Sequence, residues 1–524
     1  MQRAALLAAI VMGTALRITY QNGRAFTNDE AGSVLWLSYG YTYLLTHFNV
    51  WLSMNVYLAL TKFLATVSQG NPWVMVAPSL LSGAATIPLT AAVGVRVTSA
   101  RAAVVAAWLV AGNPFLIFYS VQLRSYMPLT ACCLTSLVFF LDWRRSERWA
   151  DGIACAIAML LAVLMHANGV YFAGFLLVLF AHWLWAGVRR WRLAATLVLA
   201  GIPAALVACI VYAPIHRPMR ELGKDWTDVS PTSVSYIPYV AGEYFGRGFR
   251  ILPSLAFLSW GAWTASQRNH SLAMLTFGAI VPVAMASLAG LSHYPWAYAR
   301  FLIFALPLLL LILAEGVTNG PWAGHALLCV ALTSFVLSSW TSDLRRQFEE
   351  KSNRPWGEIA GFLRSRIEPG DVLVASDYDD AFPALNLRVH LGKRRNSYNF
   401  PPVSSFLEPS KAAEPGRIFF IEPHEPIVTT APQAQFGTVQ VVVYSAPTRR
   451  AEAEALLADL EQSLHGQVSD TRTGDYRLVL DLLAALGHPD VGYSNLRLYY
   501  RCLMRTPRQR WAPRQKLGIP PDRN

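Results

Sequence analysis

Directly after its first apolar segment the chain reads Arg24-Ala25-Phe26-Thr27-Asn28-Asp29-Glu30-Ala31-Gly32-Ser33. Two adjacent carboxylates, Asp29 and Glu30, therefore stand where a membrane surface is expected, and aromatic residues follow them at 36–43. Taken alone, an acidic pair in such a loop is either a solvated turn or a functional site. The organisation of the remaining chain favours the functional site.

The composition predicts a membrane protein. Of the 524 residues, 54% are hydrophobic and 15% are charged, whereas soluble proteins carry about 25% charged residues. The apolar residues fall in blocks of about twenty, the length that crosses a bilayer as a helix. We therefore predict a polytopic α-helical membrane protein with about eleven spans. The predicted spans are residues 4–20, 74–95, 102–119, 126–142, 150–165, 169–187, 193–213, 251–266, 271–290, 300–315 and 322–340.

Loop charge orients these spans, because Lys and Arg accumulate in short cytoplasmic loops. If residues 51–68 form an amphipathic surface helix and the N-terminus is cytoplasmic, all four basic short loops lie in the cytoplasm. If 51–68 spans, they lie outside unless the N-terminus is also inverted. We prefer the surface helix, which places the Asp29-Glu30 loop outside. The basic loops contain Arg96 and Arg101; Arg144, Arg145 and Arg148; Arg189, Arg190 and Arg192; and Arg268.

The positive-inside rule does not explain the cations on the predicted outer face. Individually they are solvated loop charges, but collectively they indicate a site for an anion, and phosphate is the anion expected at a membrane. Carboxylates and an anion site on one face favour group transfer from a phosphorylated lipid. These cations are Arg24, Lys62, Arg124, Arg217, Arg220, Lys224, Arg247, Arg250 and Arg300.

The chain divides into three parts. Residues 1–340 form the transmembrane domain, in which 21–73 are an outer loop with juxtamembrane helices. In residues 341–504, helical periods and strand-like runs alternate, which predicts a soluble extracytoplasmic α/β domain. The tail, 505–524, is basic and rich in Pro. The predicted helices of the second part are 355–366 and 449–464, and its predicted strands are 372–375, 417–421 and 439–444.

The sequence predicts no metal site and no nucleotide site. The six cysteines show no metal-ligand spacing, and no Gly-rich phosphate loop is present. For the acidic run Asp377-Tyr378-Asp379-Asp380 we prefer a turn with solvated acids over a cation site. No cofactor is certain, and a divalent cation stays open as an alternative. We expect no nucleic-acid partner.

The first predicted span ends in Leu16-Arg17-Ile18, and a short loop then brings Asp29-Glu30-Ala31. With the motifs described below, this arrangement resembles the GT-C class of membrane glycosyltransferases, in particular the group of protein O-mannosyltransferases and the aminoarabinose transferase that acts on lipid A. In that family the first span ends in a Leu-Arg-Leu-like motif, and a short loop then brings Asp-Glu. The juxtamembrane segment Ser53-Met54-Asn55-Val56-Tyr57-Leu58 matches the family poorly.

The third predicted span carries a further match. The family pattern is Ser-Pro, several apolar residues, then Tyr-Ser-x-x-x-Arg-x-Tyr, and residues 113–126 run from Asn113-Pro114 to Tyr119-Ser120 and on to Arg124-Ser125-Tyr126. Gln122 stands where the family often has Glu. His166 and Arg300-Phe301 also match. The resemblance covers about 340 residues in order and spacing, and it implies an outward-facing active site.

The resemblance implies catalytic roles for the acidic pair. Asp29 would be the general base or the carboxylate that orients the acceptor; the alternative is that Asn28 or Asp29 caps a helix. Glu30 would orient its neighbours or interact with the N-terminus of that helix. Arg17 is expected to reach the headgroups or to pair with Asp29 or Glu30.

The other expected site residues bind the donor. Arg124, Arg300, Lys62 and Arg247 would hold the lipid phosphate, although span-end Arg and Lys also reach headgroups without binding substrate. His166, Tyr126 and Gln122 would contact substrate, and a buried hydrogen-bonded His is the alternative for His166.

We therefore predict an inverting glycosyltransferase that transfers a sugar from a polyprenyl-phosphate donor to an extracytoplasmic glycan, lipid or protein acceptor. It would be a multi-pass protein of the bacterial inner (plasma) membrane, in contact with membrane lipids, with its active site and C-terminal domain on the periplasmic side. Two alternatives stay open: a secondary transporter, and a lipid-linked oligosaccharide ligase or polymerase with a pyrophosphate donor.

Overall fold

In the computed structural model, contacts divide the chain into two compact units. The first unit comprises Met1–Arg24 and Trp36–Phe348, and the second comprises Ala25–Leu35 and Glu349–Asn524. The structure describes residues 2–22, 27, 30, 33–34, 36–37, 40–46, 54–68, 70–185, 240, 244–245, 258–263, 299–319, 356–366, 372–375, 417–422, 434–436 and 439–445.

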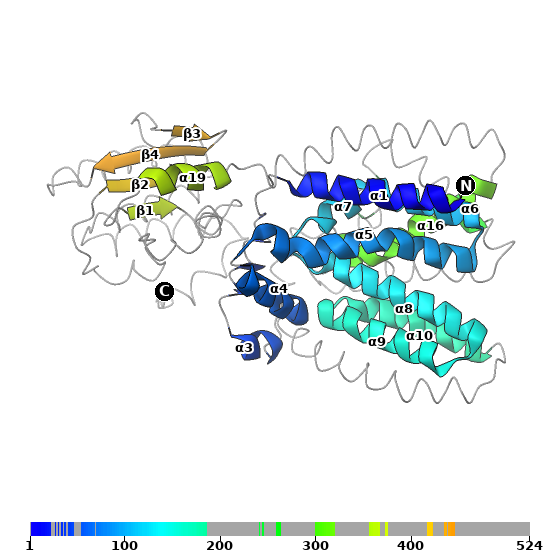
Figure 1. Ribbon diagram of the computed structural model, residues 1–524. Helices are drawn as coiled ribbons and strands as arrows, with labels where there is room; N and C mark the ends of the chain where they lie inside the picture. Colours follow the sequence, from blue (N-terminus) through cyan, green and yellow to red (C-terminus); the bar gives the residue numbers. More distant parts are fainter. Residues whose placement is uncertain are drawn as a thin grey trace, which may run out of the picture. The chain divides into compact units, whose positions relative to one another are not determined.

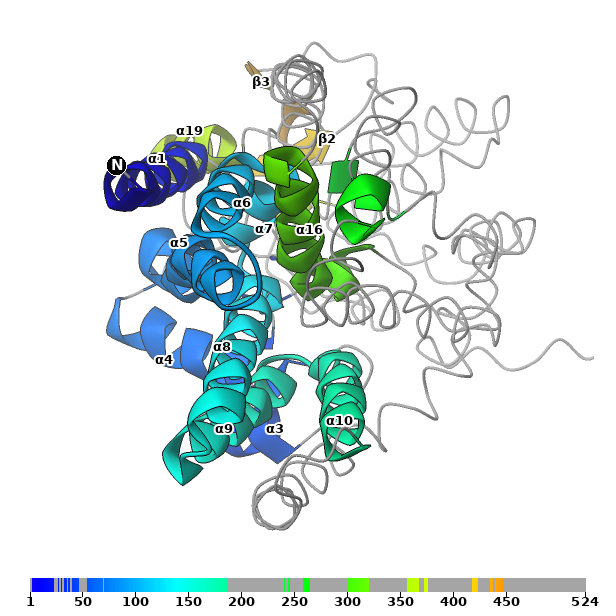
Figure 2. The ribbon, with the colours of Figure 1, turned by 90° about the vertical axis from the view of Figure 1, so that its right-hand side faces the viewer.

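The first unit is a bundle of apolar helices. Counting the bent pair α6–α7 as one segment, successive segments from α5 to α10 run antiparallel, and α5 lies beside both α6 and α8 in both views (Figures 1 and 2). The bundle helices are α1 (Gln2–Gln21), α5 (Pro72–Val97), α6 (Ala100–Gly112), α7 (Pro114–Ser120), α8 (Tyr126–Ser146), α9 (Trp149–Met165), α10 (Gly169–Trp185), the 3-10 helix η3 (Ala299–Ala305) and α16 (Leu306–Asn319).

The described helices make this a multi-pass membrane protein. Within the described residues, four helical stretches are long and apolar enough to cross a bilayer: α1, α5, α8 and Ala299–Thr318. The bent pair α6–α7, with 60° between its halves, is a fifth candidate. The predicted spans 193–213, 271–290 and 322–340 lie outside the described residues, as does most of 251–266.

The ambiguous segment 51–68 contains a short helix, α4 (Asn55–Val67), after the one-and-a-half-turn helix α3 (Tyr41–Thr46). At 13 residues, α4 is about 20 Å long, whereas the hydrocarbon core is about 30 Å thick. It packs against α5 and α9, and it lies beside one end of the bundle (Figure 1). Its length supports the non-spanning interpretation.

The antiparallel order sorts the connections between helices into two groups. The turn at 121–125, the turn at 166–168 and the start of α5 lie at one end of the bundle, which we call the site end. The short connections at 98–99 and 147–148 lie at the opposite end, which we call the basic end because it carries Arg96, Arg101, Arg144, Arg145 and Arg148.

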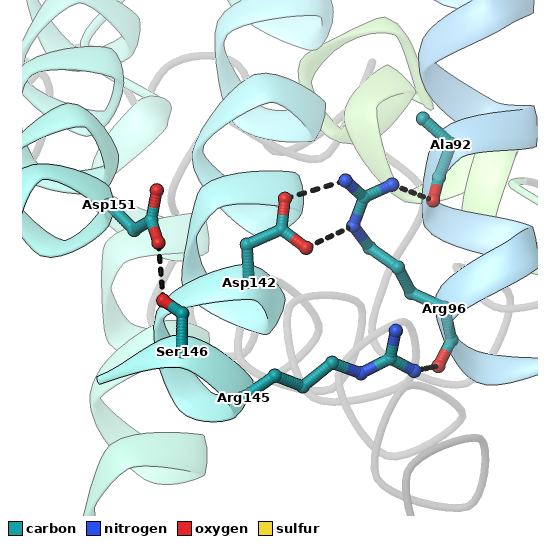
Figure 3. A network of polar contacts seen from close by, with 6 residues as sticks. All are labelled: Ala92, Arg96, Asp142, Arg145, Ser146 and Asp151. Carbon is teal, nitrogen blue, oxygen red and sulfur yellow. Dashed lines mark hydrogen bonds and ion pairs between the residues drawn. The ribbon is translucent and has the colours of Figure 1, made fainter. Parts of the chain in front are cut away.

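At the basic end a charged network joins α5 to α8 (Figure 3). Arg96 makes a two-point contact with Asp142, through Nε at 2.7 Å and Nη2 at 2.6 Å, and its Nη1 donates to the Ala92 carbonyl at 2.7 Å. Arg145 donates to the Arg96 carbonyl at 2.6 Å. Asp142 thus neutralises Arg96, one of the arginines from which a cytoplasmic loop was predicted.

In the second unit the described elements are one helix, α19 (Trp356–Arg366), and a four-stranded sheet in the order β1-β2-β4-β3. β1 pairs in parallel with β2, while β2–β4 and β4–β3 pair antiparallel. The predicted helix 355–366 and the three predicted strands coincide with α19, β1, β2 and β4. The assignment of 341–504 as one extracytoplasmic domain stays a prediction, and 449–464 and 505–524 lie outside the described residues. The strands are β1 (Val372–Ala375), β2 (Arg417–Glu422), β3 (Ala434–Phe436) and β4 (Val439–Ser445).

The Arg96–Asp142 pair generates a prediction about stability. Asp142→Asn removes a two-point charged contact, but both side chains are partly exposed, so we expect a loss of about 1 kcal/mol. The melting temperature of the purified protein should fall more than for Asp151→Asn, which removes only a single-point contact with Ser146. An equal fall for the two variants would show that the pair does not hold α5 to α8.

Candidate anion-binding site

The predicted turn between the third and fourth apolar segments is present at 121–125. α7 ends at Ser120, whose hydroxyl donates to the Leu116 carbonyl. The Arg124 N–H then donates to the Gln122 carbonyl at 2.8 Å, and α8 begins at Tyr126. Gln122 and Tyr126 are buried. The turn therefore carries two of the predicted site residues, Gln122 and Arg124, and a third, Tyr126, begins the helix that follows it.

Neighbouring helices fix the backbone of Arg124. Its carbonyl accepts a hydrogen bond from the Ser79 hydroxyl of α5 at 2.7 Å. The Ser79 hydroxyl is also 2.9 Å from the Tyr57 hydroxyl of α4. The Arg124 Nη1 lies 3.9 Å from the Met54 sulfur. Met54, which directly precedes α4, therefore contacts Arg124, and Tyr57 of α4 supports it through Ser79.

A second turn, between α9 and α10, carries His166. Its Nδ1 accepts a hydrogen bond from the backbone N–H of Asn168 at 3.2 Å, and the Asn168 amide donates to the Phe301 carbonyl at 3.3 Å. Gly169 closes the turn: a Cβ there would approach the backbone of Val163 to 2.8 Å. This turn is thus tied to η3, which lies more than a hundred residues further along the chain.

Aromatic rings join the two turns to η3. The ring of Tyr126 lies 5.4 Å from that of His166 and 6.2 Å from that of Phe301. The rings of His166 and Phe301 are 5.9 Å apart. Arg300 lies with its Cζ 5.5 Å from the Phe301 ring centre. We call Arg124, Tyr126, His166, Arg300 and Phe301 the cation–aromatic cluster.

The cluster combines positive charge with a neutral imidazole. Burial and, to a smaller extent, the nearby charges of Arg124 and Arg300 lower the pKa of His166 to about 3. His166 is therefore neutral at physiological pH. Because Nδ1 accepts the Asn168 N–H, the ring proton is assigned to Nε2, which becomes a hydrogen-bond donor. Two guanidinium groups and one neutral donor are complementary to an anion such as a phosphate monoester.

The structure thus brings four of the predicted residues together: Arg124, Tyr126, His166 and Arg300. It describes Lys62 in another setting, where its Nζ donates to the Leu37 carbonyl at 2.8 Å and lies 5.4 Å from the Tyr41 ring centre. Asp29 and Arg247 lie outside the described residues.

Glu30 belongs to the second unit, where it forms a capping box with Thr27. The Thr27 N–H donates to the Glu30 carboxylate at 2.8 Å, and the Glu30 N–H donates to the Thr27 hydroxyl at 3.4 Å. The capping residue is therefore Thr27, where the sequence had suggested Asn28 or Asp29. The Thr-x-x-Glu spacing at 27–30 is the signal that identifies it.

Arg17 corrects a further expectation. It was expected to reach headgroups or to pair with Asp29 or Glu30, but it is fully buried. In the described part of the chain its partners are neutral oxygens: the Ser120 hydroxyl and the carbonyls of Gly13, Val110 and Ala111. The contacts by which Ser79, Tyr57 and Asn168 position the two turns were also missed. They depend on how neighbouring helices are aligned, and one sequence carries no signal for that alignment.

Comparison with known proteins identifies the fold. No protein-family model and no curated protein sequence matches the chain. The chain has the fold of the GT-C membrane glycosyltransferases. It is similar to the crystal structure of ArnT from Cupriavidus metallidurans in the apo state, with a TM-score of 0.56 at 16% identity over 83% of this chain and 97% of that chain.

Two further structures share the fold. ArnT bound to undecaprenyl phosphate gives a TM-score of 0.55 at 14% identity, covering 84% of this chain and 98% of that chain. The archaeal oligosaccharyltransferase AglB from Archaeoglobus fulgidus, in complex with an inhibitory peptide and a dolichol-phosphate, gives 0.50 at 12% identity, covering 74% of this chain and 64% of that chain. At these identities the likeness is one of fold.

The neutral state of His166 generates a prediction about pH. Its folded pKa of about 3 lies below the ordinary 6.5, so between these values the unfolded chain holds a proton that the folded chain does not. The contribution of His166 to the free energy of unfolding is therefore constant above about pH 6.5, and it declines as the pH falls below that value. The melting temperature should fall between pH 6.5 and 5, and the slope should be shallower for His166→Gln. Equal slopes would contradict a buried neutral His166.

Proposed function

We propose that the chain is a glycosyltransferase that transfers a sugar from a polyprenyl-phosphate donor to an extracytoplasmic acceptor, which is a glycan, a lipid or a protein. The observation that carries this proposal is the pair of guanidinium groups, Arg124 and Arg300, around the neutral His166. The GT-C fold supports it, and supports it over the transporter alternative. The likeness to ArnT, whose structure was solved with undecaprenyl phosphate, agrees with the proposed donor.

In this proposal Arg124 and Arg300 hold the donor phosphate. The bond between the anomeric carbon and the phosphate oxygen breaks during transfer, so negative charge increases on the phosphate. Guanidinium groups can contact two phosphate oxygens at once, and their effect is larger in a buried site than in water. His166 adds a neutral Nε2–H donor without adding a third positive charge.

Asp29 is the proposed general base. The acceptor hydroxyl attacks the anomeric carbon from the side opposite the phosphate, which inverts the configuration at that carbon. Asp29 accepts the hydroxyl proton, and polyprenyl phosphate leaves with the electrons of the broken bond. Thr27 and Glu30 hold each other in the capping box. Glu30 therefore acts as an orienting residue.

The remaining predicted residues have secondary roles in the proposal. Tyr126 packs on His166 and keeps the imidazole in place, and Gln122 lies buried in the same turn. Lys62 and Arg247 are proposed as further phosphate contacts.

We place the reaction on the extracytoplasmic side of the inner membrane. The cation–aromatic cluster lies at the site end of the bundle, and five arginines lie at the basic end. By the positive-inside rule the basic end is cytoplasmic, which puts the cluster, and with it the proposed active site, outside. The proposal includes an extracytoplasmic C-terminal domain.

The test is sugar transfer in membranes, with radiolabelled polyprenyl-phosphate sugars as donors. Asp29→Asn should reduce the transfer rate about 10²- to 10⁴-fold, the usual contribution of a general base, while donor binding is retained. Arg124→Gln should raise the KM for the donor. The matched control is Arg101→Gln, which removes an exposed arginine at the basic end and should leave both parameters unchanged.

Transfer that persists in Asp29→Asn would remove this residue from the chemistry. Equal donor KM values for Arg124→Gln and Arg101→Gln would contradict the phosphate site. Transfer by the wild type from pyrophosphate-linked donors alone would replace the proposal with a lipid-linked oligosaccharide ligase or polymerase.

A further inference from the structure

The guanidinium of Arg17 is fully buried inside the helix bundle. Nε donates to the Ser120 hydroxyl at 3.0 Å, and Nη1 donates to the Gly13 carbonyl at 2.8 Å. Nη1 also donates to the Ala111 carbonyl at 3.2 Å, and Nη2 donates to the Val110 carbonyl at 3.3 Å. Arg17 thus connects α1 to the last turn of α6 and to the last residue of α7.

These carbonyls need donors because the third apolar segment is broken. α6 ends at Gly112, so the carbonyls of its last turn, at 109–112, lack partners within the helix. Pro114 begins α7, and it has no N–H to offer to Val110 four residues earlier. An unpaired carbonyl inside a bilayer costs several kcal/mol. Arg17 supplies donors to two of these carbonyls.

The same carbonyls make the buried charge tolerable. The C-terminal end of a helix carries partial negative charge, which stabilises a cation placed there. The guanidinium of Arg17 contacts the C-terminal end of α6 through both terminal nitrogens. A planar guanidinium group can donate hydrogen bonds to several acceptors at once through its three nitrogens, whereas lysine has a single ammonium group.

Arg17 also fixes the position of α7. Ser120 accepts from Arg17 and donates to the Leu116 carbonyl, so the guanidinium holds both the break before α7 and the end of this helix. Gly83 of α5 permits this approach, because a Cβ at that position would collide with the Ser120 hydroxyl and would lie 3.2 Å from the Arg17 Nε. The turn with Gln122 and Arg124 begins immediately after Ser120.

We infer that Arg17 is a positioning residue for the donor phosphate: it clamps the α6–α7 break and thereby sets the place of the turn that carries Arg124. This inference rests on the proposed function for its ligand. The clamp itself is a property of the free protein and can be measured without any ligand. Arg17 acts through α7 and the turn, and it is not proposed to touch substrate.

The experiment compares Arg17→Gln and Arg17→Lys with the wild type, with Gly94→Ala as a matched control. Gly94 packs tightly at the basic end, where a Cβ would lie 2.7 Å from the Ala103 Cβ, so this variant perturbs the bundle away from the turn. The first readout is hydrogen–deuterium exchange of residues 121–125 in the purified full-length protein. The second is the affinity for undecaprenyl phosphate.

We expect exchange at 121–125 to increase in Arg17→Gln and to stay at the wild-type level in Gly94→Ala. The affinity of Arg17→Gln should fall roughly tenfold, and the transfer rate roughly a hundredfold, as for other displacements of about 1 Å. The affinity of Arg17→Lys should lie between those of Arg17→Gln and the wild type, because lysine keeps the positive charge but lacks the planar guanidinium group.

Three results would overturn the inference: unchanged exchange in Arg17→Gln, wild-type affinity in that variant, or full restoration by Lys. Failure of the proposed function would look different. The wild type would then show no affinity for undecaprenyl phosphate, while the exchange data would still decide whether Arg17 holds the turn.

Discussion

A membrane helix that breaks must find new partners for its backbone polar groups, and this constraint organises the site end of the bundle. The break at Asn113-Pro114 bends the α6–α7 segment by 60°. Asn113 caps α7 by accepting from the Leu116 N–H at 3.0 Å, and Arg17 donates to the carbonyls of Val110 and Ala111. With these bonds made, α7 has a defined direction, and the turn at 121–125 follows from it.

The charges in and around this turn form a candidate anion-binding site because two further elements meet there. The α9–α10 turn supplies His166, and η3 supplies Arg300. Packing of Tyr126 and Phe301 against the imidazole excludes water, and burial beside two guanidinium groups keeps His166 neutral. A phosphate would neutralise the two cations and would accept the Nε2–H bond, which links the geometry of the free protein to the proposed polyprenyl-phosphate donor.

Local and repetitive signals in the sequence predicted much of the fold. The length of the apolar segments predicted most of the described bundle helices, and short strand-like apolar runs predicted strands β1, β2 and β4, because both signals depend on residue order alone. Arg124, His166 and Arg300 were predicted from span-end cations and from the family resemblance, and the structure places them near one another. Arg17 was placed wrongly, since its partners lie about a hundred residues away and are backbone carbonyls, which every residue has. The hydrogen bonds by which Ser79 and Tyr57 position Arg124 were also missed, because the register between two packed helices cannot be inferred from one sequence.

The central claim is that a lipid phosphate binds at Arg124, Arg300 and His166. The most direct measurement is an experimental structure of the full-length protein in lipid nanodiscs with undecaprenyl phosphate added. The account predicts phosphate density within hydrogen-bonding distance of both guanidinium groups and of the His166 Nε2. Phosphate density at another place on the protein, with these three side chains uninvolved, would contradict it.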